Sequence, residues 1–187
     1  MGEAGLGLDF RVPGVGWGER IHPMLRLISL VLMFYSYFLI QTSLPKLPPC
    51  IPTHFDAAGN ANGWGSPNTL WFLLVAQVVT GAVFLVVPYM GRRFPGTVNL
   101  GTRRLSDYTP AQQARILPLL HDMMAYMSIL MNLFFVFMLQ RVIHAATQPH
   151  PQLPAAWPLG LLLGTSLLVT LYYLRRITRT AKEEGPT

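Results

Sequence analysis

The chain of 187 residues is long enough for one domain. Hydrophobic residues make up 51% of it and charged residues only 12%, which is about half the charged share of an average soluble domain. This composition excludes a disordered chain, a collagen-like chain and an ordinary soluble enzyme, and it indicates an integral membrane protein.

Four apolar stretches are each long enough to cross the hydrocarbon core of a bilayer as a helix, which takes about 20 residues. In chain order they cover residues 24–43, 70–90, 123–140 and 153–174. The first is longer than the apolar part of a signal peptide, and no small-x-small cleavage site follows it. Because a lipid-exposed backbone must satisfy its own hydrogen bonds, the sequence predicts an all-α membrane protein with four transmembrane helices in residues 24–174.

The basic residues predict the orientation of these helices. If both termini are cytoplasmic, twelve of the 14 Lys and Arg residues face the cytoplasm, and only Lys46 and Arg141 lie outside. Cytoplasmic loops carry such an excess of basic residues, and anionic lipid head groups attract them. Topology therefore accounts for the net charge of +6, and no nucleic acid is expected as a partner. Residues 1–23 and 175–187 are predicted to be cytoplasmic, the first of them irregular because it is rich in glycine.

The extracytoplasmic loop between the first two helices, residues 44–69, contains five prolines and three glycines. Since prolines disfavour a regular helix and glycines permit tight turns, we expect a compact ordered loop rather than a strand pair. Its candidate ligand-binding residues are His54, Phe55, Asp56, Asn60, Asn62 and Trp64. Its candidate structural residues are Pro52, Gly59 and Gly63.

His54 and Asp56 leave two interpretations open. An imidazole beside a carboxylate is able to act as a base or to hold a metal ion, with His144 and His150 of the second outer loop as further ligands. In the other interpretation, the Asx side chains bond the nearby backbone of a turn, and the loop serves recognition. The second interpretation is favoured, so no cofactor is expected, and a membrane metalloenzyme using His54 and Asp56 is the alternative.

The third helix is predicted to begin before its apolar stretch. Thr109, Pro110 and Gln112 have the spacing of a capping box with proline at the first helical position. Further along this helix, His121 and Asp122 are predicted to be a polar pair at the cytoplasmic membrane boundary, or a proton-handling pair. In either case they lie a bilayer away from the outer loop.

Polar and small residues within the spans predict contacts between helices. Gln77, Thr80 and Asn132 are expected to make interhelical hydrogen bonds. Gly160 and Gly164 match the small-xxx-small pattern of helix packing, either within the chain or in a homo-oligomer. This pattern also permits a third function, that of an accessory subunit in a larger membrane complex.

The outer loop contains the pattern Pro-x-His-Phe-(Asn/Asp)-x-x-Gly-x-x-(Asp/Asn)-x-Trp, here Pro52, His54, Phe55, Asp56, Gly59, Asn62 and Trp64. With its proline-rich lead and its place between two membrane helices, residues 24–90 resemble the DUF1648 family. Its relatives include the SdpI-type immunity proteins of bacteria, which protect a cell from a secreted peptide toxin and can help signal its presence. The resemblance implies a protein of the bacterial cytoplasmic membrane whose outer loop binds an extracytoplasmic peptide or lipid-like ligand, in toxin immunity or sensing.

Overall fold

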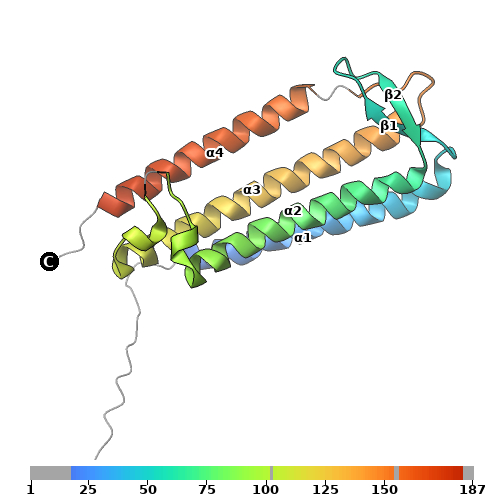
Figure 1. The fold of residues 1–187 in the computed structure, drawn as a ribbon. Coiled ribbons are helices and arrows are strands. Elements are labelled where there is room, and N and C mark those ends of the chain that lie inside the picture. Colours follow the sequence, from blue (N-terminus) through green and yellow to red (C-terminus); the bar gives the residue numbers. More distant parts are fainter. Residues whose placement is uncertain (1–17, 102, 154–155, 183–187) are drawn as a thin grey trace, which may run out of the picture.

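The computed structural model describes residues 18–101, 103–153 and 156–182, which form an elongated bundle of four long helices (Figure 1). The helices are α1 (Gly18–Ser43), α2 (Leu70–Arg93), α3 (Pro110–Ala145) and α4 (Ala156–Lys182). Each contains a stretch long and apolar enough to cross a membrane. The protein is therefore a multi-pass membrane protein.

The helices extend beyond the stretches that hydropathy marks. α1 begins at Gly18, inside the segment expected to be irregular, and residues 1–17 lie outside the described residues. α4 begins at Ala156 rather than at Leu153, and it continues past the predicted end at Leu174 to Lys182. Basic side chains in its last turn favour this extension because they oppose the negative end of the helix dipole.

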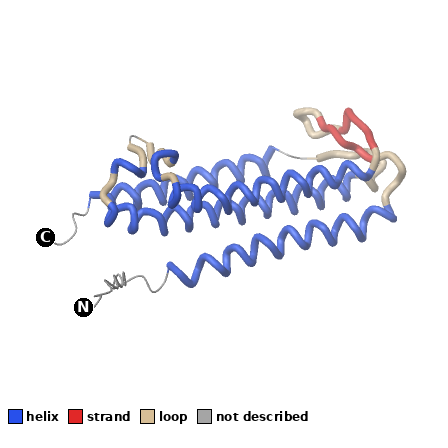
Figure 2. The backbone as a smooth tube through the Cα atoms, turned by 60° about the horizontal axis from the view of Figure 1, so that its bottom comes forward, coloured by secondary structure: helices blue, strands red, loops and turns tan. Residues whose placement is uncertain are grey.

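The two ends of the bundle have different structures (Figure 2). The terminal end contains the start of α1, the end of α4 and the connection between α2 and α3. The hairpin end contains the other connections. At the terminal end a buried apolar cluster joins α3 to α4, and at the hairpin end another joins α1, α2 and α3. α3 contacts all three other helices, whereas α4 packs mainly against α3.

A buried polar network joins α1, α2 and α3 inside the bundle. Gln77 Nε2 donates to Asn132 Oδ1 at 2.9 Å, and Asn132 Nδ2 donates to the Ser128 carbonyl at 2.7 Å. The hydroxyl groups of Ser128 and Ser29 are hydrogen-bonded at 3.1 Å. The predicted interhelical bonds are confirmed for Gln77 and Asn132, whereas Thr80 has none within the described part of the chain.

The predicted start of α3 is also confirmed. Thr109 Oγ1 accepts a hydrogen bond from the Gln112 amide at 3.3 Å, and Gln112 Oε1 accepts one from the Thr109 amide at 3.0 Å. Two of the orphan amides at this helix end are thereby satisfied, and Pro110 needs no partner at the first helical position. The helix consequently begins well before its apolar stretch.

The expectation that the loop of residues 44–69 lacks a strand pair was wrong. Strands β1 (Ile51–Phe55) and β2 (Ala61–Gly65) form an antiparallel hairpin. Pro52 lies opposite Trp64, and the register shifts between Pro52 and His54 and again between His54 and Phe55. Proline is tolerated in edge strands and at bulges, and both strands of a two-stranded sheet are edges, so Pro52 did not argue against a strand here.

Gly160 and Gly164 do not mediate packing within the described chain. A Cβ atom added at either position would meet nothing within 4 Å, and both residues lie on the exposed side of α4. Gly81 of α2 instead makes room for a side chain of α1, because an added Cβ would collide with the end of the Met33 side chain. Packing of Gly160 and Gly164 between chains stays a prediction.

Candidate functional site

The hairpin is anchored on the helical bundle through the first residues of β1. The side chains of Ile51 and Pro52 are almost completely buried. Ile51 belongs to the apolar cluster that contains Ile40 of α1, Leu70 of α2 and Leu139 of α3. Burial of an aliphatic side chain of this size contributes about 1.5–3 kcal/mol, so the strand is held firmly against three helices.

Asp56 and Asn60 build the turn of the hairpin. The Asp56 amide donates to the Asn60 carbonyl at 2.9 Å, and the Asn60 amide donates to Asp56 Oδ1 at 2.9 Å. Asn60 Nδ2 lies 3.4 Å from Asp56 Oδ2. The positive φ of 85° at Gly59 closes the turn and is strained for residues with a Cβ.

This bonding sets the electrostatics of the turn. The Asn60 backbone amide, as the main cause, lowers the pKa of the exposed Asp56 carboxyl below its ordinary value, and the Asn60 side chain also lowers it. Hydrogen bonds to a carboxylate favour its charged form. The arrangement agrees with the interpretation in which Asx side chains bond the nearby backbone of a turn, with Asp56 shaping the loop.

His54 is bonded across the hairpin to Asn62, through its Nδ1 atom and the Asn62 Oδ1 atom. An amide oxygen only accepts, so with this amide orientation Nδ1 of His54 carries a proton. In the neutral ring, Nε2 is then an acceptor. The facing Gly63 makes room for this side chain, since an added Cβ would lie 2.8 Å from the His54 Cβ.

Five of the six predicted ligand-binding residues are exposed, and two of them, Asp56 and Asn60, form the turn. The other three lie on the strands of the hairpin: His54, Asn62 and Trp64. We call this set the hairpin face. The Trp64 side chain is 55% exposed, although tryptophan side chains are on average largely buried. Phe55 is half-buried and does not belong to this set. The structure thus separates the predicted site into the turn-forming residues Asp56 and Asn60 and the hairpin face.

The second outer loop contacts the hairpin turn, which the sequence reasoning considered only as a way to bring His144 and His150 near His54. The Leu153 amide donates to the Gly59 carbonyl at 2.7 Å, and the Ala61 amide donates to the Pro151 carbonyl at 3.3 Å. Gln152 Nε2 lies 3.3 Å from Asn60 Oδ1, and the two residues form an antiparallel bridge. The only sequence signal for this contact is that both loops connect helices at the same end of the bundle.

The structure gives no support to a metal centre on the hairpin. Within residues 18–101, 103–153 and 156–182, no group of three or more His, Cys, Asp or Glu side chains is placed to hold a metal ion. Both Asp56 carboxylate oxygens already accept hydrogen bonds in the turn.

The predicted polar pair at the other boundary lies in the half of α3 nearer the terminal end. The His121 ring is 6.0 Å from the ring of Tyr89 on α2, and Asp122 lines a cavity between α3 and α4. Neither residue contributes to the hairpin site.

Comparison with known proteins gives one match. Residues 27–78 match the model of the family DUF1648, described as a domain of unknown function. This segment contains most of α1, the whole hairpin and the first part of α2, and every residue of the loop pattern lies within it. No curated protein and no solved structure matches the chain. The protein is therefore a membrane protein in which residues 27–78 match a DUF1648 domain.

Proposed function

We propose that the hairpin face binds an extracytoplasmic ligand, a peptide or a lipid-like molecule, and that the protein serves toxin immunity or sensing in the bacterial cytoplasmic membrane. The observation that carries this proposal is the large exposed surface of Trp64 beside the bonded pair of His54 and Asn62. An exposed aromatic ring with polar neighbours is typical of a binding hot spot.

The rigidity of the hairpin supports a binding role. Burial of Ile51, the Asp56 turn and the contacts with Gln152 hold the strands before any ligand arrives. A preorganised surface loses less conformational entropy on binding, so more of the contact energy appears as affinity. The His54 Nε2 atom supplies one directional polar contact, and the Trp64 ring supplies apolar area.

The proposed orientation places the hairpin end outside the cell. Cys50 is the only cysteine of the chain and is exposed beside β1. A membrane-impermeant maleimide added to intact cells is expected to label the protein, and Cys50→Ser is expected to remove the label. Labelling that occurs only after the cells are opened would place the hairpin in the cytoplasm and would exclude an extracytoplasmic ligand.

The binding role is tested with the full-length protein in nanodiscs. The probe is the peptide fraction of spent medium from the bacterium that makes this protein. Binding is measured by the fluorescence emission of Trp64, in a variant whose other tryptophans are replaced by phenylalanine. Protection is measured by the growth of a deletion strain that expresses each variant. We expect saturable binding by the wild type, and a loss of binding and of protection with His54→Ala.

The control is Asn68→Ala, which alters an exposed side chain outside the hairpin face. It is expected to behave as the wild type does. If His54→Ala and Asn68→Ala give the same binding and the same growth, the hairpin face does not bind this ligand. A further Trp64→Ala variant with unchanged protection would exclude the aromatic contact.

A further inference from the structure

A groove separates α3 from α4 between two points of contact. Near the terminal end, Tyr173 of α4 packs on the buried cluster of α3, with its ring 6.1 Å from that of Tyr126. Near the hairpin end, the rings of Phe137 and Trp157 lie 5.3 Å apart in an edge-to-face arrangement. Between these contacts lies a partly open cavity of about 470 Å³, which we call the α3–α4 groove.

The lining of the groove is mostly apolar, with Gln140 and Thr165 as its polar members. It includes Leu130, Leu133 and Phe134 of α3 and Leu161 and Leu162 of α4. These residues belong to the stretches that are long and apolar enough to cross a membrane, so the surrounding medium at this depth is lipid chains. An apolar cavity of this kind does not hold water. Because lipid chains surround the helices at this depth, an acyl chain is the group expected to fill it.

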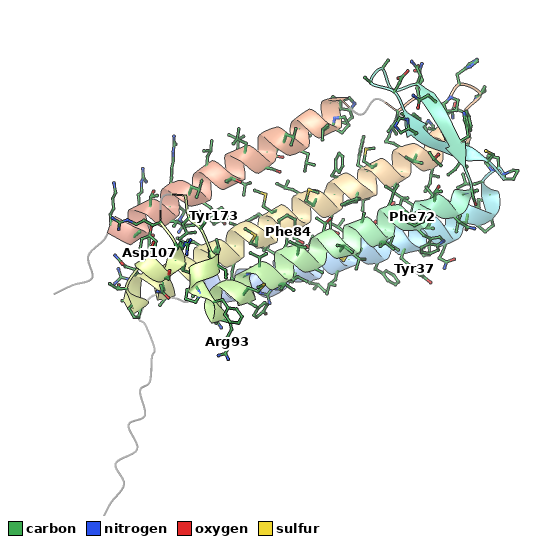
Figure 3. The ribbon with its side chains drawn as sticks, viewed as in Figure 1. Tyr37, Phe72, Phe84, Arg93, Asp107 and Tyr173 are labelled. Atoms are coloured by element: carbon green, nitrogen blue, oxygen red, sulfur yellow. The ribbon has the colours of Figure 1, made fainter. Side chains whose placement is uncertain are left out.

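A second cavity, of about 300 Å³, lies on the same seam nearer the terminal end. We call it the head pocket. Its lining differs in kind from that of the groove, because it contains an acidic group, a basic group and three phenol rings: Asp122, Arg176, Tyr126, Tyr172 and Tyr173. In Figure 3, Tyr173 lies at the terminal end between α4 and α3.

The charged groups of the head pocket come from different helices. Asp122 belongs to α3 and Arg176 to α4. The Arg176 guanidinium lies 5.8 Å from the Tyr172 ring centre, and its Nη1 atom is 3.5 Å from the Tyr172 hydroxyl. This contact holds the guanidinium against an aromatic side chain, and arginine and tyrosine near the end of a membrane span favour the level of the lipid head groups.

The two cavities are neighbours along both helices. Tyr126 of the head pocket precedes Leu130 of the groove by four residues on α3, and Val169 follows Thr165 by four residues on α4. Four residues make about one helical turn, or about 6 Å. A molecule with a polar head and an apolar chain therefore fits the seam with its head in one cavity and its chain in the other.

We propose that this seam binds a phospholipid whose head group carries both a phosphate and a primary ammonium, as in phosphatidylethanolamine. Arg176 binds the phosphate through charge-assisted hydrogen bonds. Asp122 accepts hydrogen bonds from the ammonium, and the tyrosine rings favour a cation over their faces. The complementarity of one acid and one base selects a zwitterionic head group, because Asp122 repels one that is only anionic.

The test uses the full-length protein in nanodiscs that contain equal amounts of phosphatidylethanolamine and phosphatidylglycerol, followed by native mass spectrometry of the lipids it retains. We expect the wild type to retain phosphatidylethanolamine preferentially. Asp122→Asn should lower this preference about tenfold, equivalent to about 1.4 kcal/mol. Arg176→Gln should lower the retention of both lipids, whereas Arg175→Gln, which alters the neighbouring exposed base outside the pocket, should leave it unchanged.

A second pair of variants tests the groove by bulk alone. Leu162→Trp fills the groove and should reduce lipid retention, whereas Leu163→Trp on the exposed face of α4 should not. Equal retention of the two lipids by the wild type would overturn the proposal. An unchanged lipid preference in the folded Asp122→Asn variant would also overturn it. A dimer that Leu162→Trp dissociates would overturn it too, since the groove would then hold a second copy of the chain.

Discussion

His54 and Asp56 lie two positions apart in β1 and the following turn, yet their surroundings give them different roles. Asp56 accepts hydrogen bonds from Asn60 within the turn, whereas His54 is bonded across the strands to Asn62 and remains exposed. The residue types allowed a joint site for catalysis or metal binding, and only the backbone path shows which partner each side chain has. This path depends on Gly59 and Gly63. In the sequence these glycines predict that a turn is present, but they do not predict its geometry.

At the residue scale, the Asp56 bonds predict a pH dependence of hairpin order. The pKa of Asp56 is lowered in the folded protein, chiefly by the Asn60 amide, so its contribution is fully present above the unfolded pKa of about 4. This contribution is lost as the pH falls through the lowered folded value. Amide hydrogen exchange at Asn60 and Ala61, corrected for the intrinsic effect of pH, is expected to become faster in that acidic range.

Asp56→Asn is the matched control for this titration. The amide keeps an acceptor oxygen for the Asn60 amide but has no charge to lose, so the corrected exchange should show no transition below about pH 4. A transition of the same size and midpoint in Asp56→Asn would show that another group controls the order of the hairpin.

At the scale of the elements, hydropathy predicts the helices well because the thickness of the bilayer sets a minimum apolar length. It does not predict their ends, since α1 and α4 continue outside the apolar stretches, where water satisfies the polar side chains. The capping box of Thr109 located the start of α3 correctly because it is a local hydrogen-bond pattern. The hairpin was missed because Pro52 lies in an edge strand, where its missing amide is harmless.

The buried network between the helices predicts how much one polar side chain stabilises the bundle. Asn132→Ala removes the acceptor for Gln77 and leaves that buried amide without its partner. We expect the free energy of unfolding, measured in mild detergent by steric trapping, to fall by about 0.6–2 kcal/mol. Ser36→Ala is the control, because this buried hydroxyl bonds only the Leu32 carbonyl of its own helix. An equal loss in the two variants would show that the interhelical bond adds nothing.

At the scale of the whole molecule, the pairing of the two outer loops is the feature that sequence reasoning could not supply. Asn60 and Gln152 are far apart in the chain, and neither residue belongs to a recognisable motif with the other. Their bridge arises because the α1–α2 and α3–α4 connections lie at the same end of the bundle. The contact connects the hairpin that follows α1 to the segment that precedes α4.

This contact predicts a disulfide between the two loops. Opposed residues in an antiparallel bridge have Cα atoms about 4.5–5.5 Å apart, which is within the range of about 4.4–6.8 Å that disulfides span. The Asn60 and Gln152 side chains already meet at 3.3 Å. In a Cys50→Ser background, the double variant Asn60→Cys and Gln152→Cys should therefore form an intramolecular disulfide under mild oxidation, detected by its altered mobility on a non-reducing gel.

The single variants Asn60→Cys and Gln152→Cys are the controls, and they should stay monomeric and unshifted at low protein concentration. The bridged protein should also unfold at a higher temperature than its reduced form, because the cross-link restricts the unfolded chain. A double variant that stays reduced, or that forms only intermolecular disulfides, would show that the loop of residues 146–153 does not pair with the hairpin. The hairpin face would then be held by the Asp56 turn and the burial of Ile51 alone, and its preorganisation for a ligand would be correspondingly weaker.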